Sequence, residues 1–414
     1  MRCDPARRNG ATILLLAEGQ IHTGPNQQKV RSFMTSSTSL SLPQPFTQEG
    51  THRAMFWWLV IVGAFVCSMI LVGGATRLTD SGLSITEWRP VTGAIPPLSL
   101  EAWEAELDKY RQIPEYQEQN IGMSMSEFQF IYWWEWGHRQ LGRTLGLVYF
   151  IPFVFFLVTG AAPKRLRPRL WVLLGLGGLQ GAIGWWMVAS GLVDRLDVSQ
   201  YRLATHLSMA FVILGLTAWT ALELRYGQTQ LLRRGRLFVW SAVFWSAVML
   251  QIMLGAFVAG LDAGRLYTTW PGFYGQVFPY DYLGGLPIWQ AIFESRPAVQ
   301  LNHRWFAYAL LIGGVVLSYR YWRGNDALQR RFGMVIPAVL LTQVILGILT
   351  LVHAAPLSLS LLHQGGAIAL FLVAGGACWA AARAVGETAQ SPGPITAREI
   401  TSRATTLTRS SPRS

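Results

Sequence analysis

The sequence predicts an all-α polytopic membrane protein, with eight transmembrane helices arranged as two tandem four-helix bundles. Of its 414 residues, 51% are hydrophobic and only 14% are charged, whereas soluble domains carry about 25% charged residues. The 18 Trp, 20 Phe and 13 Tyr are too many apolar rings for a disordered chain, and three cysteines are too few for a disulfide scaffold. Composition therefore argues against an ordinary soluble enzyme.

Eight apolar runs are long enough to cross a bilayer as a helix, which takes about 20 residues. They cover residues 56–76, 131–159, 170–190, 201–222, 237–260, 298–319, 333–353 and 360–382. An even number of spans places both ends of the chain on the same side of the membrane.

The net charge of +12 is a topology signal. Five segments that would share one side hold 23 of the 34 Lys and Arg residues but only seven of the 22 acidic residues. They are the N-terminal region and residues 160–169, 223–236, 320–332 and those after 382. By the positive-inside rule, both termini face the cytoplasm or the mitochondrial matrix. The basic residues thus give no reason to expect a nucleic-acid partner.

An internal repeat divides the chain into two halves. Asp80 and Gly82 match Asp262 and Gly264 at an offset of 182, as do their neighbours Gly73 with Gly255, Thr86 with Thr268 and Trp88 with Trp270. Further matches pair His138 with His303, Gln180 with Gln343, Gly184 with Gly347 and His206 with His363. The halves, 56–222 and 237–382, are joined by the basic linker 223–236. Since each has four spans, they share one orientation, related by an axis along the membrane normal.

The two ends of the chain are polar. Residues 1–55 are rich in Arg, Ser, Thr and Gln, which is compatible with a mitochondrial presequence and equally with a mis-assigned start upstream of Met34. Residues 383–414 are rich in Ser, Thr, Pro and Arg and predict a disordered tail.

Four of the seven histidines occupy related positions. His138, His206, His303 and His363 lie near the start of the second, fourth, sixth and eighth spans, the helices that run inward from the outer side. Ionisable side chains inside a span are costly and mark functional sites. Two pairs repeated by duplication therefore predict metal coordination within each four-helix bundle. The other three are His22 and His52 in the polar N-terminal region and His353, which has no histidine opposite it in the repeat.

The kind of metal follows from the ligands. Zinc takes four converging ligands, usually with Cys or acidic groups among them, whereas each half offers two histidines and no nearby thiol. Two axial imidazoles in an apolar bundle suit heme. Five glycines near the histidines leave space for a macrocycle and also allow close helix packing in lipid: Gly137, Gly142, Gly146, Gly365 and Gly366.

The two halves differ at one position beside the histidines. Glu135 lies three residues before His138 and on the same helical face, and its counterpart in the second half is Gln300. A carboxylate at this place predicts a catalytic role at one heme only.

Three arginines bear on this assignment. The alternative role for Glu135 is an ion pair with Arg139 or Arg143, which are also candidates to bind heme propionates. Arg304, which matches Arg139 in the repeat, is a candidate propionate partner at the second heme.

Together these residues resemble the heme A synthase family. The resemblance rests on the run Gly73–Pro97, on Glu135–Arg139 (EWGHR), on Asn302–Arg304 and on Leu362–Gln364, and covers about residues 55–385. It implies conversion of heme O into heme A, by oxidation of a porphyrin methyl group to a formyl group, for use in cytochrome oxidase.

The resemblance also implies roles for the two halves. The first is expected to hold the substrate heme, with His138 and His206 as axial ligands, and the second a heme b on His303 and His363. Glu135 matches the family's functionally important acid. It could stabilise the electron-poor carbon formed during oxidation or deprotonate a water.

Partners and location are further implications. They are the farnesyltransferase that makes heme O, cytochrome oxidase assembly, an unidentified electron carrier and the lipid bilayer of a bacterial or mitochondrial inner membrane, with homo-oligomerisation left open. Some family members carry a cysteine pair in the outer loops. Here Cys3 precedes the first span, and Cys67 and Cys378 lie within spans, so the chain resembles the proteobacterial and mitochondrial type.

Two rival functions use the same histidines. A diheme b-type electron-transfer cytochrome accounts for both pairs, as does a heme transporter with labile ligation. Neither accounts for an acid at only one pair or for the motif at 73–97.

Overall fold

The computed structural model describes residues 48–193, 195–227 and 235–390, and this part of the chain forms helices and no strand. Eight helices are long: α1 (Gln48–Leu78), α4 (Met125–Val158), α5 (Arg167–Val188), α6 (Gln200–Tyr226), α7 (Arg236–Gly260), α9 (Arg296–Trp322), α10 (Ala327–Val352) and α11 (Leu357–Gln390). Three are short: α2 (Leu100–Tyr110), α3 (Pro114–Glu118) and α8 (Ile288–Glu294). Two single 3₁₀ turns lie at Thr92–Ala94 and Ala263–Arg265.

Each long helix covers one of the eight predicted apolar runs. Seven of them are long and apolar enough to cross a membrane. The exception, α9, is 27 residues long but contains the polar segment from Gln300 to Arg304 near its start, which lowers its hydropathy. The chain is a multi-pass helical membrane protein, as the composition predicts.

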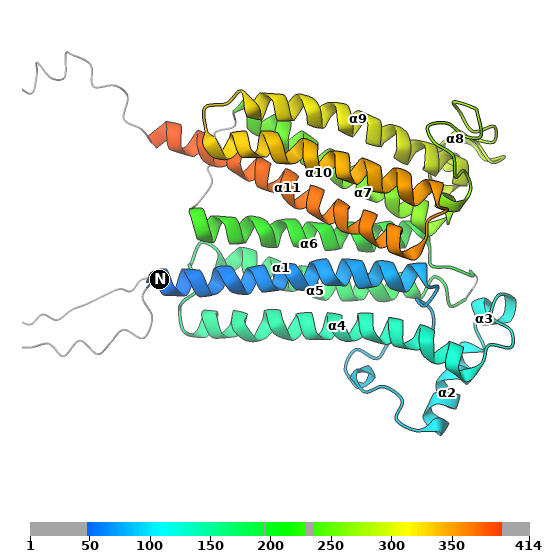
Figure 1. Ribbon diagram of the computed structural model, residues 1–414. Coiled ribbons are helices and arrows are strands. Elements are labelled where there is room, and N and C mark those ends of the chain that lie inside the picture. The colour runs from blue at the N-terminus through cyan, green and yellow to red at the C-terminus, as the bar shows by residue number, and fades with distance from the viewer. Residues whose placement is uncertain (1–47, 194, 228–234, 391–414) are drawn as a thin grey trace, which may run out of the picture. The chain divides into compact units, whose positions relative to one another are not determined.

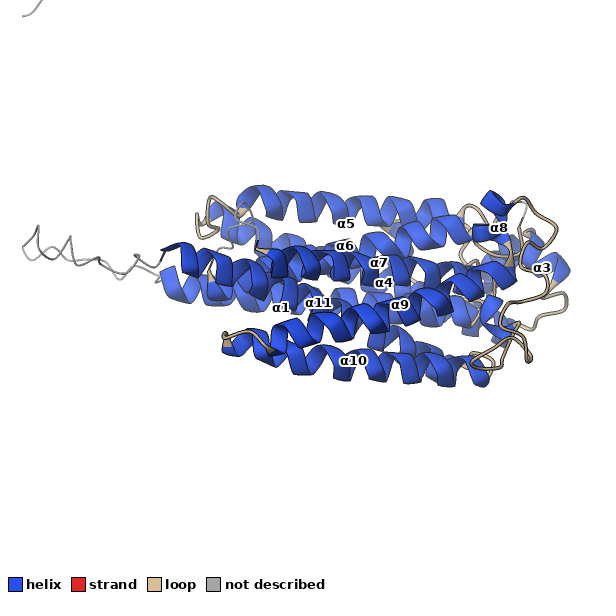
Figure 2. Cartoon of the chain, turned by 90° about the horizontal axis from the view of Figure 1, so that it is seen from above, coloured by secondary structure: helices blue, strands red, loops and turns tan. Residues whose placement is uncertain are grey.

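The long helices form two rings of four with the same order of contacts. In the first bundle (α1, α4, α5 and α6), neighbours pair in that order and α6 returns to α1. In the second bundle (α7, α9, α10 and α11), neighbours likewise pair in order and α11 returns to α7. The bundles meet where α6 and α1 contact α7 and α11, and the long helices run alongside one another (Figures 1 and 2). The largest buried apolar cluster spans this contact and includes Phe211, Phe244 and Phe371.

The short helices gather at one end of the long ones, on the right in Figure 1, which we call the loop end. There Trp103 and Tyr110 of α2 pack on Tyr132 and Phe128 in the first turns of α4, and Tyr116 of α3 packs on Tyr110. The connection 77–130 therefore folds around a buried aromatic cluster of its own. Its apolar residues are spaced for packing against α4 and carry no membrane-span signal.

The loop end also holds an ion-pair network between the bundles. Arg77 at the end of α1 lies 3.0 Å from Asp80 and 2.9 Å from Asp262, which follows α7. Asp80 and Asp262 both adopt left-handed backbone conformations, with φ of 49° and 48°. These two aspartates are partners in the sequence repeat, so the local backbone is the same at both places.

Four helix bounds differ from the sequence expectation by six residues or more. Helix α1 begins at Gln48 instead of residue 56, and α10 begins at Ala327 instead of residue 333. Helix α4 begins at Met125 instead of residue 131, because Ser124 and Glu127 form a reciprocal capping box at its start. Helix α11 continues to Gln390, past the expected boundary at 382. The polar extension and the tail otherwise fall on residues 1–47 and 391–414, outside the described residues.

Candidate heme sites and the Glu135 network

The four histidines lie on diagonally placed helices. His138 is on α4 and His206 on α6, and both of these helices contact α1 and α5. His303 is on α9 and His363 on α11, and both of these contact α7 and α10. Each pair therefore faces across the middle of its own four-helix ring. Since α4 begins early, His138 lies several turns into its helix, whereas the other three lie in the second turn of theirs.

A glycine on the adjacent helix makes room for each histidine ring. A Cβ atom at Gly73 would lie 3.0 Å from His138 Nε2, and one at Gly184 would lie 2.9 Å from His206 Cε1. In the second bundle, a Cβ at Gly255 would lie 3.1 Å from His303 Cε1, and one at Gly347 would lie 2.9 Å from the same atom of His363. The four glycines are thus required by ring placement.

Glutamine side chains fix the histidine backbone. Gln180 donates from Nε2 to the His206 carbonyl at 3.0 Å, and Gln343 does the same to His363 at 2.9 Å. Gln251 donates to the His303 carbonyl at 2.9 Å. Hydrogen bonds to the supporting helix orient a ligand before it binds metal.

The spacing of the second pair suits a metal held by one nitrogen of each ring. The ring centres of His303 and His363 are 6.4 Å apart and their planes lie at 85°. A metal held between one nitrogen of each ring, at bonds of about 2 Å, places the ring centres about 6 Å apart. The buried Nδ1 atoms of His206 and His363 have no protein partner, so each bundle keeps a free ring nitrogen. Among the described residues, no three His, Cys, Asp or Glu side chains converge on a metal position.

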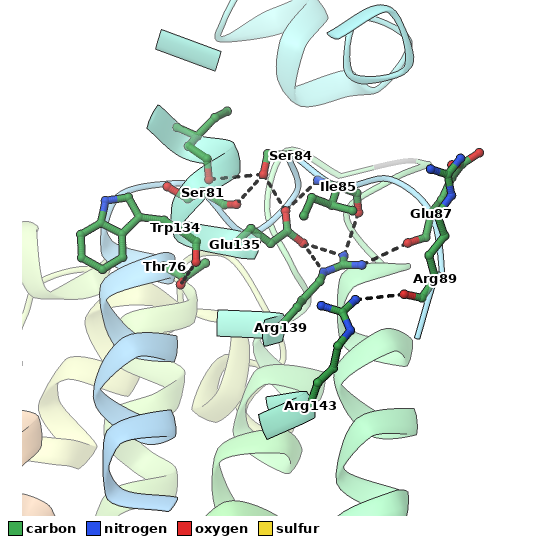
Figure 3. A network of polar contacts seen from close by, with 11 residues as sticks. Thr76, Ser81, Ser84, Ile85, Glu87, Arg89, Trp134, Glu135, Arg139 and Arg143 are labelled. Carbon is green, nitrogen blue, oxygen red and sulfur yellow. Dashed lines mark hydrogen bonds and ion pairs between the residues drawn. The ribbon is translucent and has the colours of Figure 1, made fainter. Parts of the chain in front are cut away.

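Glu135 is buried and saturated with hydrogen bonds (Figure 3). Its Oε2 accepts bonds from Ser84 Oγ and from the backbone N–H of Ile85, both at 2.7 Å. Its Oε1 accepts bonds from Arg139 Nε and Nη2 at 3.1 and 2.6 Å. We call these four residues the Glu135 network; it joins α4 to the loop that follows α1.

The three arginines expected at heme propionates bind loop carbonyls in this structure. Arg139 donates to Ile85 and Glu87, at 2.8 and 3.0 Å. Arg143 donates to the carbonyls of Pro90 and Arg89, at 2.9 and 3.0 Å.

Arg304 donates in the same way in the second bundle, to the carbonyls of Tyr267 and Thr269 at 2.6 and 3.0 Å. Tyr267 and Thr269 lie 182 residues after Ile85 and Glu87, the two residues that Arg139 binds. In each half, an arginine therefore binds the carbonyls of the corresponding loop. The guanidinium of Arg304 also lies over the Phe273 ring at 4.4 Å, and its buried Nε has no partner.

Gln300 replaces the acid in the second bundle. Its Nε2 donates to the Tyr267 carbonyl at 3.1 Å, whereas Glu135 accepts from the backbone N–H of Ile85, the counterpart of Tyr267. The second site therefore keeps the link between helix and loop without the negative charge.

A pocket opens beside the Glu135 network. It has a volume of about 150 Å³ and lies between the loop 85–97, the start of α2 and the face of α4 that carries Tyr132, Arg139 and Arg143. Its lining combines arginines with apolar groups such as Ile95 and Pro96. The pocket gives solvent access to the loop that the network holds.

Glu115 on α3 is a second buried acid at the loop end. It is 3% exposed, and its Oε2 has no hydrogen-bond partner. Burial, reinforced by the negative charges of Glu135, Asp197 and Asp80, raises the pKa of this carboxyl to about 8. Nothing in the sequence pattern singles out this residue.

The sequence prediction placed the histidines correctly on helices of matched position but missed what surrounds them. The glycines that receive the rings are Gly73, Gly184, Gly255 and Gly347, whereas space for a macrocycle beside the five expected glycines stays a prediction. Among those five, Gly137 and Gly146 face open space. The signal was present, since all four ring-contacting glycines are matched pairs in the repeat.

A family model described as cytochrome oxidase assembly protein matches residues 56–374, which include every candidate site residue. The heme A synthase of Maricaulis maris is 56% identical over 341 residues, which make up 82% of this chain and 100% of that protein. That of Parvibaculum lavamentivorans is 48% identical over 326 residues, 79% of this chain and 94% of the relative. That of Dinoroseobacter shibae is 50% identical over 327 residues, 78% and 85%.

Proposed function

The chain belongs to the heme A synthase family and oxidises a methyl group of heme O to a formyl group, and we propose that this oxidation takes place in the first bundle. The product, heme A, serves cytochrome oxidase. Membership of this family disfavours the alternative of a diheme cytochrome that leaves both of its hemes unmodified.

The proposed architecture is a tandem duplication of one four-helix unit, with eight membrane spans and both halves in the same orientation. Its support is the equal order of helix contacts in the two rings and the equal use of Arg139 and Arg304 to hold carbonyls at an offset of 182. The basic segments 160–169 and 320–332 lie opposite the loop end. This arrangement favours termini in the cytoplasm and a bacterial inner membrane, in line with the bacterial relatives.

The proposed ligands are His138 and His206 for the substrate heme and His303 and His363 for a resident heme b. The support is the four rings held on glycines and, for the second pair, a separation that suits two axial imidazoles. When bound, heme b supplies reversible one-electron chemistry between the first site and an external electron carrier. Arg304, whose buried Nε lacks a partner, is the proposed contact for a propionate at this site.

The asymmetry between Glu135 and Gln300 is the observation that assigns the chemistry to the first bundle. Oxidation withdraws electrons from the methyl carbon, and a fixed carboxylate stabilises the positive charge that develops there. Both oxygens of Glu135 already accept two bonds each. This saturation favours a fixed electrostatic role over proton abstraction from water, for which one donor has to leave.

The other two arginines have mixed roles in this proposal. Arg139 completes the Glu135 network, and Arg143 borders the pocket beside it, where a propionate of the substrate heme can exchange with the loop carbonyls. Heme O synthase and the cytochrome oxidase assembly pathway are the proposed partners upstream and downstream.

The function is tested by expressing the chain in a host that makes heme O, then extracting the hemes and separating them by chromatography with mass detection. We expect the parent to yield heme A. His206→Ala should lose the first heme and the product but keep heme b, whereas His363→Ala should lose heme b. A parent protein that binds two hemes and leaves heme O unchanged, with electron donor and acceptor supplied, would overturn the synthase assignment in favour of the cytochrome.

A further inference from the structure

Two consecutive glycines on α1 receive side chains from different bundles. A Cβ at Gly73 would press on the ring of His138, 3.0 Å away on α4. A Cβ at the next residue, Gly74, would overlap the amide of Gln364 on α11. One step of the α1 backbone therefore contacts a proposed ligand of the first heme and a residue of the second bundle.

Gln364 also makes a hydrogen bond across this contact. Its Nε2 donates to the backbone carbonyl of Ile70 on α1 at 2.8 Å. Ile70 is buried in the cluster shared by the two bundles. The bond thus forms in an apolar setting, where an amide without a partner is costly.

Gln364 directly follows His363, a proposed ligand of the second heme. A short chain of contacts consequently connects the two sites, running from the His138 ring to Gly73, along one peptide unit to Gly74, and through Gln364 to His363. Each link is a covalent bond, the Gln364 hydrogen bond to α1, or a position where a Cβ atom added on α1 would meet the facing side chain.

We propose that Gln364 is a positioning residue that couples the two heme sites, by fixing the helix of His363 against the stretch of α1 that receives His138. This inference rests on the proposed ligand assignment. Its consequence is that occupancy of the first site alters the redox properties of heme b, and that electron transfer between the sites depends on the Gln364 side chain.

The coupling is absent at the repeat-related position. In the sequence repeat, Leu207 on α6 matches Gln364, just as the preceding His206 matches His363. Ala256 on α7 matches Gly74 at the offset of 182. Leu207 packs against an apolar cluster that includes Ala256. The polar link therefore occurs on one side of the contact between bundles, so the repeat alone does not require it.

The alternative is that Gln364 only supports the local helix. Gln343 provides the matched control, since it also holds the His363 segment, through a 2.9 Å bond to the His363 carbonyl, but does so from α10 in the same bundle. For the glycine side of the contact, a Cβ added at Gly63 on α1 would meet no atom within 4 Å. Gly63 therefore serves as the control for Gly74.

The experiment measures the midpoint potential of heme b in the holoprotein, with the first site filled and with it emptied by His138→Ala. The two midpoint potentials, with the first site filled and emptied, are compared in the parent and in four variants: Gln364→Leu, Gln343→Leu, Gly74→Ala and Gly63→Ala. Heme content and the kinetics of heme A formation are recorded for each protein with an intact first site.

We expect emptying the first site to shift the potential in the parent, in Gln343→Leu and in Gly63→Ala. In Gln364→Leu and Gly74→Ala the shift should fall by at least half, with both hemes retained. In these two variants kcat should fall severalfold, because the relative placement of the two sites that Gln364 fixes is lost, with KM for heme O unchanged.

Two results separate the possible failures. An equal shift in the parent, Gln364→Leu and Gln343→Leu, with hemes bound in all three, overturns the coupling role and leaves the proposed function intact. A parent whose heme b content does not depend on His303 or His363 instead overturns the ligand assignment, and the coupling proposal with it.

Discussion

Glu135 and Arg139 form a buried ion pair one turn apart on α4, with 2.6 Å between Oε1 and Nη2. The same guanidinium donates to two carbonyls of the loop after α1, and the same carboxylate accepts bonds from Ser84 and Ile85 in that loop. The pair therefore fixes the loop, and it places a negative charge about one helical turn before His138. Two roles of Glu135, electrostatic and structural, have to be separated by experiment.

Glu135→Gln is the substitution that separates them, because it removes the charge and keeps the size of the side chain. We expect both hemes to be retained and heme A formation to fall by about 100-fold, the usual effect of losing a preorganised electrostatic contact. Heme extraction and chromatography measure the outcome, with heme O or a hydroxylated intermediate accumulating. Glu135→Ala should additionally lower the thermal stability. If the Gln variant makes heme A at the parent's rate, the charge has no catalytic role.

Arg139→Gln is expected to destabilise the protein, because it leaves the Glu135 carboxylate buried without its counter-charge. Removal of one partner from a buried ion pair costs about 3–5 kcal/mol, and the Arg139 side chain is 18% exposed against 4% for Glu135. Thermal unfolding of the detergent-solubilised protein measures this change.

Arg143→Gln is the matched control for Arg139→Gln, since Arg143 is half-buried, binds carbonyls of the same loop and forms no ion pair with an acid among the described residues. We expect it to cost about 1–2 kcal/mol, because its two carbonyl bonds lie where water can replace them. Equal losses in both variants would mean that the carbonyl contacts, and not the ion pair, hold the loop.

The sequence predicts the helical class and the positions of the histidines, but not the ion-pair partner of Glu135. Long apolar runs and repeated histidines are one-dimensional patterns, so the helical membrane class and the helices of all four histidines follow from the sequence. The partner of Glu135 was left open between Arg139 and Arg143, because both lie on the same helical face. Only the loop position shows that Arg139 makes the pair, while Arg143 reaches carbonyls farther along the loop.

The structure of the connection 77–130 could not be predicted from the sequence. Helices α2 and α3 are short and are stabilised by aromatic packing, of α2 on α4 and of α3 on α2. Their sequences therefore show no long periodic pattern. The buried state of Glu115 depends on this packing and is invisible in the sequence.

Gly184→Ala tests the contact between helix backbone and histidine ring. Its new Cβ would lie 2.9 Å from His206 Cε1, and since α5 is a regular helix the ring has to move. We expect substrate heme content to fall severalfold, with heme b unchanged, as read from extracted hemes. Gly178→Ala on the same helix meets no neighbouring atom and should retain both hemes. A Gly184→Ala protein with full occupancy of the first site would show that the ring reaches heme from another position.

The raised pKa of Glu115 should make the free energy of unfolding depend on pH. Its pKa is about 8 in the folded protein, because of burial and of the nearby charges of Glu135, Asp197 and Asp80, against an ordinary value of 4.5. Between these values the folded chain holds a proton that the unfolded chain has released, so the free energy of unfolding falls as the pH rises. The stabilising contribution is complete below pH 4.5 and lost above about pH 8.

Glu115→Gln removes this titration while keeping a neutral side chain of the same shape. We therefore expect its thermal midpoint to change less than the parent's between pH 5 and pH 8, and to exceed the parent's at pH 8. Glu118→Gln, at an exposed position on the same helix, should follow the parent at both values. A parent that gains stability over this range, or a Glu115→Gln protein with the parent's slope, would show that Glu115 releases its proton in the folded state at ordinary pH. The buried carboxylate would then need a counter-charge at the loop end that the described contacts do not provide.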